Sequence, residues 1–371
     1  MTKIFRLIFL VIMCLILSSG LVFSAFAAAE NNSGILCVSH GGDTTIYENN
    51  TQQAVLSAFE KGADFVSVNI RKNADGALVV CSDNKTEVTG VSLVELLSQL
   101  EDNNALILDF SVELKDEVYS IIEGENAYSK AVLRINDSAK NIVKWLDGKN
   151  ENLQVIGVYD SFVVFTAISH IEILSDADMK MVAYRSKNYF NEMFGSLVSK
   201  TLKKDNMSKA MVSTYDPDLC GQRSDSEDGW NDLIKKGYSV IETNNLDAFL
   251  RYIGSNIAIR EELRAVYEKS LLINVDNYNV VSQEKLLDAA EIAENKLRCE
   301  AVSNDELQDS AARLRLAIQN LALKTDEDTQ KGALNITAGK VVATVLVGLA
   351  ILAAQIYTYK MKKQKKQIIN K

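Results

Sequence analysis

The feature that most constrains the fold is an alternation of short β-branched runs with amphipathic stretches between residues 35 and 254. Alternating strand and helix patterns are typical of βαβ units that build a parallel sheet. Seven or eight such units over about 220 residues predict a (β/α)8 barrel within residues 30–254. We expect strands at Ile35–Ser39, Phe65–Ile70, Ala77–Cys81, Ala105–Phe110, Lys130–Ile135, Leu153–Tyr159, Lys180–Tyr184, Lys209–Ser213 and Ser239–Thr243. Ala77–Cys81 is either a strand of the sheet or the hairpin partner of Phe65–Ile70, and the second alternative leaves eight barrel strands.

The pattern becomes purely helical between residues 257 and 324. Apolar residues there recur at the i, i+3, i+4, i+7 spacing of one helix face. Ser303 and Glu306 have the spacing of a capping box, which marks a helix start. These features predict a small three-helix bundle.

Both ends of the chain carry membrane-targeting patterns. Residues 1–29 have an N-terminal charged region, an apolar run and small residues ending at Ala29, which predicts a secretory signal peptide. After a linker at 325–339, we expect a transmembrane helix at residues 340–359, because Val341–Tyr359 is almost wholly apolar and long enough to span a bilayer. Residues 360–371 are basic and should remain in the cytoplasm. We therefore expect a single-pass cell-membrane protein with an outer ectodomain.

Charge and cysteine usage exclude some classes of protein. The formal net charge is -9, and nucleic-acid binding requires a basic face, so nucleic acid is not expected as a partner. The cysteines are widely spaced and form no Cys-x-x-Cys pair. We therefore expect buried single thiols rather than a disulfide framework or a zinc site.

Four short blocks suggest a family. They are His40-Gly41-Gly42, Glu48-Asn49-Asn50-Thr51, Gly62-Ala63-Asp64 and Asp75-Gly76. Their order and spacing resemble the opening of the glycerophosphodiester phosphodiesterase family, and Thr243-Asn244 stands where that family ends its last strand in Thr-Asp. The resemblance covers about 220 residues. It implies a TIM barrel, phosphoric diester hydrolysis in lipid metabolism, and a divalent cation, calcium or magnesium.

The acid–base positions of that family are only partly kept. His40 stands at the position of the first catalytic histidine. Gly41 replaces a phosphate-binding arginine, and Ser82 replaces the second histidine. The chain has only one other histidine, His170, in a helix-like stretch where a structural role is expected.

The metal positions are depleted in the same way. Ser67 and Asn69 replace a glutamate and an aspartate, so that Asp109 is the one acidic ligand kept. Hard cations usually need carboxylates. Glu48 and Asp83, together with Asp43, are candidate ligand-binding residues for a rearranged site.

Residues 278–321 resemble the FIVAR module of secreted Gram-positive surface proteins. That resemblance implies binding of proteins or glycans, or a spacer role. The apolar stripes alone indicate a helical core.

Three hypotheses follow. The first is a membrane-anchored, catalytically depleted barrel that binds a phosphate-ester or glycan ligand at the cell envelope. The second is an active phosphoric diester hydrolase, acting on glycerophosphodiesters or teichoic-acid-like polymers through a modified site. The third is a surface interaction scaffold.

Overall fold

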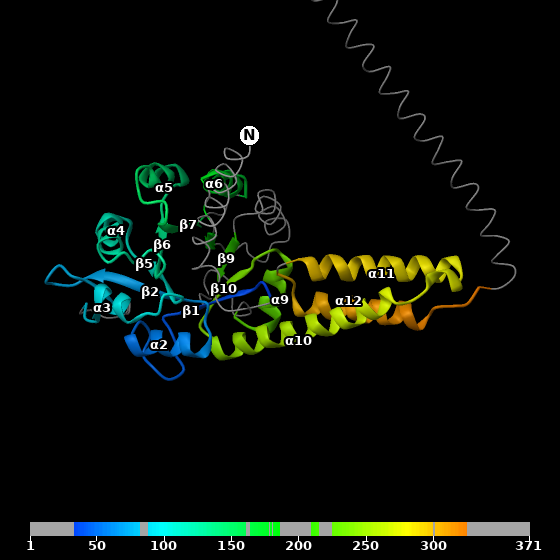
Figure 1. Ribbon diagram of the computed structural model, residues 1–371. Coiled ribbons are helices and arrows are strands. Elements are labelled where there is room, and N and C mark those ends of the chain that lie inside the picture. Colours follow the sequence, from blue (N-terminus) through cyan, green and yellow to red (C-terminus); the bar gives the residue numbers. More distant parts are fainter. Residues whose placement is uncertain are drawn as a thin grey trace, which may run out of the picture. The chain divides into compact units, whose positions relative to one another are not determined.

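The computed structural model describes residues 33–81, 88–160, 164–177, 179, 181–185, 209–214, 225–299 and 301–324 (Figure 1). The chain divides into two compact units. The first unit extends to Arg264 and also contains Asn295–Asp309. The second unit contains Ala265–Glu294 and the chain from Ser310 onward.

The first unit contains a closed barrel of eight parallel strands among the described residues. Neighbouring strands pair in parallel around the ring, and β1 pairs with both β10 and β2, which closes it. This confirms the predicted eight-stranded parallel barrel. The strands are β1 Leu36–His40, β2 Phe65–Lys72, β5 Ala105–Asp109, β6 Ala131–Asn136, β7 Gln154–Asp160, β8 Met181–Arg185, β9 Lys209–Ser213 and β10 Val240–Thr243.

A hairpin extends from β2, which is the second of the two alternatives considered for Ala77–Cys81. Strand β3, Leu78–Val80, pairs antiparallel with the end of β2, and β4, Val91–Ser92, pairs antiparallel with β3. These two short strands lie outside the barrel ring, so Ala77–Cys81 adds no barrel strand.

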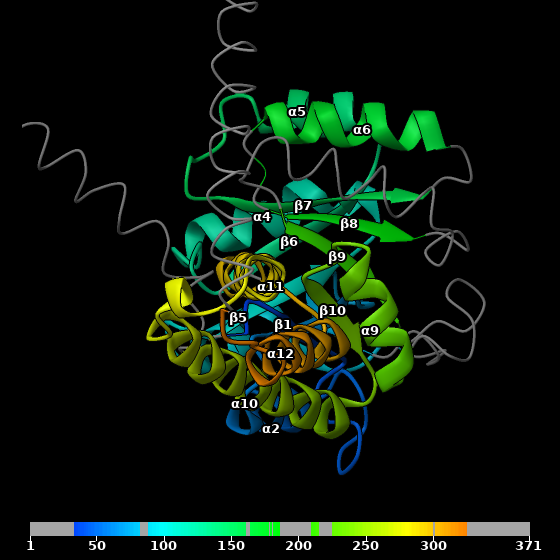
Figure 2. The same cartoon turned by 90° about the vertical axis from the view of Figure 1, so that its right-hand side faces the viewer.

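Helices cover the outside of the barrel. Figure 2 shows α5 and α6 side by side outside β7 and β8. Side-chain caps mark several helix starts: Thr51 accepts from the backbone N–H of Ala54, and Ser138 from that of Asn141. The helices are α2 Gln52–Lys61, α3 Leu93–Gln99, α4 Lys115–Gly124 after the 3-10 turn η1 Val112–Leu114, α5 Ala139–Leu146, α6 Val164–Asp176 and α9 Glu227–Lys235.

The core has two layers because side chains alternate along each strand. Outward-facing residues pack under the helices, and inward-facing ones fill the barrel. The inner layer is apolar at the amino ends of the strands, with Leu36, Phe65 and Ala105 among its members. Toward the carboxyl ends the inward positions become polar, as when Val38 is followed by His40.

Helix α10, Leu246–Leu271, runs without interruption through the predicted boundary at residues 255–256. At this boundary Asn256 is buried, and its side-chain amide donates to the Val302 carbonyl and to Asn304. Two further helices follow, α11 Val280–Arg298 and α12 Asn304–Gln319, with the 3-10 turn η2 Val275–Asn277 before α11. The predicted capping box at the start of α12 is confirmed: Ser303 and Glu306 exchange hydrogen bonds.

The predicted signal peptide (1–29), linker (325–339), membrane span (340–359) and basic tail (360–371) lie outside the described residues. Within the described part of the chain, none of the helices combines the length and apolar character needed to cross a bilayer.

Candidate functional site

The inward-facing side chains at the carboxyl ends of the barrel strands form one polar cluster. In (β/α)8 enzymes this end of the barrel holds the active site. We call the group the mouth cluster; it comprises His40 of β1, Ser67 of β2, Asp109 of β5, Arg134 of β6, Ser213 of β9 and Glu242 of β10.

Arg134 is the centre of the mouth cluster. Its guanidinium donates from Nε to Oδ1 of Asp109 at 2.6 Å and from Nη2 to the other oxygen of that carboxylate. Its Nη1 donates to Oε2 of Glu242 at 2.7 Å. One cation thus binds both oxygens of Asp109 and bridges to a second carboxylate.

The Arg134–Glu242 pair within this bridge is almost fully removed from solvent. The side chain of Arg134 is 1% exposed and that of Glu242 is 0% exposed. Burial disfavours the charge on Arg134, but the carboxylates of Asp109 and Glu242 outweigh it and raise the pKa of the guanidinium above its ordinary value. Burial likewise acts to raise the pKa of Glu242, but Arg134 and His40 outweigh it and hold that pKa well below its usual range.

His40 lies at the solvent side of the cluster, with its side chain 15% exposed. Its Nδ1 is 3.5 Å from Oε1 of Glu242 and 3.3 Å from the Ser67 hydroxyl. The Ser213 hydroxyl donates to the other oxygen of Glu242. The imidazole is therefore oriented by a carboxylate, which is an arrangement that can support proton transfer.

The backbone conformation of the turn after His40 favours glycine at both of the positions that follow it. Gly41 has φ +69° and Gly42 has φ +92°, a region that side chains with a Cβ rarely adopt. A Cβ on Gly42 would lie 2.5 Å from the Ala54 carbonyl oxygen, and one on Gly41 would lie 2.9 Å from the Asn49 Cβ. At Gly41, the position of the family's arginine, a side chain would therefore be strained by the positive φ and would press against Asn49.

Of the predicted site residues, the structure brings His40 and Asp109 into one cluster, together with Ser67. Asn69 is the register partner of Asp109 across β2 and β5. Glu48 is exposed on the loop between β1 and α2 and is not among the residues that contact one another in the cluster. Asp83 and Ser82 lie outside the described residues.

Two further candidates have structural roles. Asp43 is buried and accepts from Thr45, Ser57 and Lys61. Burial acts to raise the pKa of Asp43, but these partners outweigh it and lower that pKa to about 2. His170 accepts a hydrogen bond from the backbone N–H of Ala139 at the start of α5, which agrees with the structural role expected for it.

The residues at the expected metal positions do not fit a divalent cation. Both oxygens of Asp109 accept hydrogen bonds from Arg134, so a cation would have to displace a buried guanidinium. Ser67 and Asn69 offer only neutral oxygens, whereas calcium and magnesium sites are built mainly on carboxylates. Among the residues that the structure describes, no group of three or more His, Cys, Asp or Glu side chains has the geometry of a metal site.

Sequence reasoning missed Arg134 and Glu242, although a signal was present. Each is a charged residue at an inward-facing position of a mainly apolar strand, two residues after an inward-facing valine. Charged residues are seldom fully buried unless paired. Two opposite charges in apolar barrel strands were therefore candidates for a mutual ion pair.

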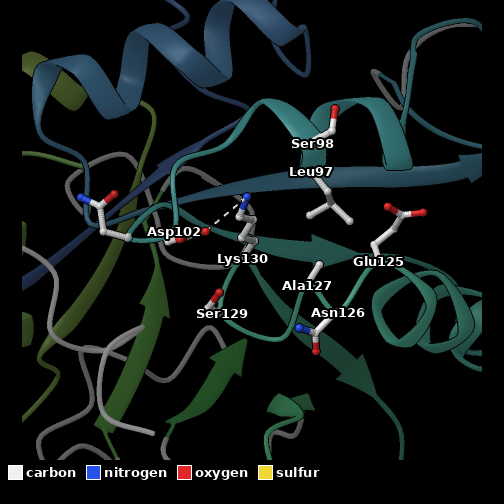
Figure 3. Close-up of a pocket in the computed structure, with 9 residues that line it drawn as sticks. Leu97, Ser98, Asp102, Glu125, Asn126, Ala127, Ser129 and Lys130 are labelled. Carbon is white, nitrogen blue, oxygen red and sulfur yellow. Dashed lines mark ion pairs between the residues drawn. The ribbon is translucent and has the colours of Figure 1, made fainter. Parts of the chain in front are cut away.

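A groove of about 610 Å³ lies at the opposite, amino-terminal ends of β5 and β6 (Figure 3). Its one lysine, Lys130, donates to the Leu100 carbonyl at 2.7 Å and pairs with Asp102 at 3.5 Å. The lysine is thus satisfied within the protein. The groove offers no chemistry comparable to that of the mouth cluster.

Comparisons with known proteins give matches in structure only. No protein-family model matches the sequence, and a search of curated proteins finds no match either.

Among solved structures, a glycerophosphoryl diester phosphodiesterase from Parabacteroides distasonis is similar over 64% of this chain and 90% of its own, with 14% identity and a TM-score of 0.48. A glycerophosphodiester phosphodiesterase from Thermotoga maritima covers 58% of this chain and 97% of its own, with 17% identity and a TM-score of 0.44. An Oleispira antarctica phosphodiesterase, solved with sn-glycerol-3-phosphate, covers 62% of this chain and 99% of its own, with 13% identity and a TM-score of 0.44. Sequence identities this low do not establish the activity of this chain.

Proposed function

We propose that this protein is a membrane-anchored barrel of the glycerophosphodiester phosphodiesterase type that has lost metal-dependent hydrolysis and binds a ligand at the outer face of the cell membrane. One observation carries the proposal. Arg134 occupies both oxygens of Asp109, the single acidic residue kept at the expected metal positions. Without a metal, the charge stabilisation that a cation gives to a phosphoryl group is lost.

The charge of the mouth cluster bears on the ligand. Asp109 and Glu242 are both partnered by one cation, Arg134, which leaves a net charge of about -1 when His40 is neutral. The guanidinium is also too buried to reach a ligand. A neutral glycan therefore suits the described residues of this mouth better than a phosphate ester does.

Hydrolysis by the full chain tests the loss of activity. Purified protein is incubated with glycerophosphodiesters in calcium, in magnesium and in EDTA, and we expect no metal-dependent turnover. Turnover that requires metal and disappears in His40→Ala would overturn the proposal.

The second candidate function is hydrolysis through a modified site, which the contact between His40 and Glu242 favours. It predicts turnover that persists in EDTA and is lost in His40→Ala. Calorimetric titration with neutral oligosaccharides and with glycerophosphodiesters then separates a binding barrel from a scaffold, because a scaffold binds neither.

A further inference from the structure

The second compact unit exposes five large apolar side chains at one end. They are Leu271 (62% exposed), Leu272 (87%), Val280 (42%), Val281 (62%) and Leu323 (69%), and we call them the apolar tip. Single exposed apolar residues are ordinary, but a group of them marks an interaction surface.

Backbone contacts place these residues at the same end. Tyr278 pairs with Leu323 in an isolated bridge, and the Asn279 backbone N–H donates to the Ala322 carbonyl at 2.8 Å. The last turn of α10 returns to α11 through the short turn η2. The end of α10, the start of α11 and the segment after α12 therefore lie together (Figure 1).

The chain leaves the unit at this same end. Sixteen residues, 325–340, separate Lys324 from the apolar run that begins at Val341. Even when fully extended, a segment of that length spans at most about 53–58 Å. If residues 341–359 cross a bilayer, the apolar tip is held within that distance of its surface, where even a weak contact is favoured by high effective concentration.

We infer that the apolar tip inserts into the interfacial layer of the bilayer that anchors the chain. This inference rests on the anchoring in the proposed function. Leucine and valine side chains gain from leaving water at that layer. The charged residues around the tip, Glu268, Lys269, Asp276 and Lys324, balance one another. The contact is therefore hydrophobic and should not depend on salt.

Fluorescence quenching by lipid tests the contact. Full-length Leu272→Trp is reconstituted into phosphatidylcholine vesicles with and without brominated acyl chains. The matched control is Val94→Trp, because Val94 is an exposed apolar residue of α3, 39% exposed, in the other unit. We expect brominated lipid to reduce emission from Leu272→Trp more than from Val94→Trp, equally at low and high salt.

Each alternative has its own signature. Equal quenching of the two variants in protein that resists alkaline carbonate extraction would overturn the tip contact and leave the anchor intact. Release by carbonate would overturn the anchor and this inference with it. Emission from Leu272→Trp that changes with the protein-to-lipid ratio but is not quenched would mean that a second copy of the chain covers the tip, which also overturns the inference.

A second variant supplies an independent measurement. Replacing Leu271 and Leu272 with aspartate alters exposed positions only and should leave the fold intact. Loss of the contact should make the adjoining linker more accessible to protease. In vesicles, trypsin should therefore cut the double variant at Lys331 several-fold faster than it cuts the parent protein. An unchanged cleavage rate would contradict the inference.

Discussion

At the scale of single residues, the barrel mouth depends on one buried cation. Arg134 satisfies Asp109 and Glu242, and Ser213 and His40 complete the partners of Glu242. Glu242 has no access to solvent, so its charge is tolerable only while that arginine is present. The same arginine occupies both oxygens of Asp109, so the stability of the mouth and the proposed loss of metal chemistry would both follow from one residue.

Replacing Arg134 by methionine should therefore destabilise the protein by roughly 3–5 kcal/mol, because a buried carboxylate loses its partner. Arg251→Met is the matched control, since Arg251 is exposed on α10. Urea denaturation measures both variants. The double variant Arg134→Met/Glu242→Met should recover much of the loss, because it leaves no buried charge. Equal destabilisation by Arg134→Met and the control would contradict the buried-pair account.

At the scale of elements, α10 is one helix of 26 residues in which Asn256 is wholly buried. Its amide satisfies the Val302 carbonyl and Asn304, both near the start of α12. This contact lies within the first unit and ties the α11–α12 connection to it.

Asn256→Leu should cost about 1–3 kcal/mol, since it keeps the volume but leaves those groups without a donor. Asn103→Leu, at an exposed position before β5, serves as the control. Thermal unfolding monitored by circular dichroism compares the two. A midpoint for Asn256→Leu no lower than that of the control would show that the buried amide contributes nothing.

The elements were largely predictable from the sequence, and the site was not. Strand positions follow from runs of β-branched residues, and the capping box at Ser303 marks the start of α12. The mouth cluster joins residues far apart in sequence, such as Arg134 and Glu242, whose pairing depends on barrel closure and strand register. The resemblance to the phosphodiesterase family predicts Asp109 as a metal ligand, whereas Arg134, which binds Asp109, lies outside the motifs of that family.

At the scale of the whole molecule, buried carboxylates set the response to acid. Asp43 and Glu242 both have folded-state pKa values below those of unfolded chains. A carboxyl group with a lowered pKa stabilises the fold at pH values above its unfolded pKa, and that contribution disappears as pH falls toward the folded pKa. For Asp43 the window runs from 3.8 down to about 2.

The contribution of these two groups to the free energy of unfolding should therefore be roughly constant above pH 5, and the stability of the protein should fall steeply below pH 4. Asp43→Asn removes one titrating group, so its stability should fall less steeply between pH 4 and pH 2 than that of the parent. Asp102→Asn is the control, because Asp102 is 96% exposed and pairs only loosely with Lys130. Urea midpoints across this pH range measure all three proteins. If Asp43→Asn follows the parent curve with an unchanged slope, the bonds from Lys61, Thr45 and Ser57 do not govern acid stability, and the loop that follows His40 is held by other contacts.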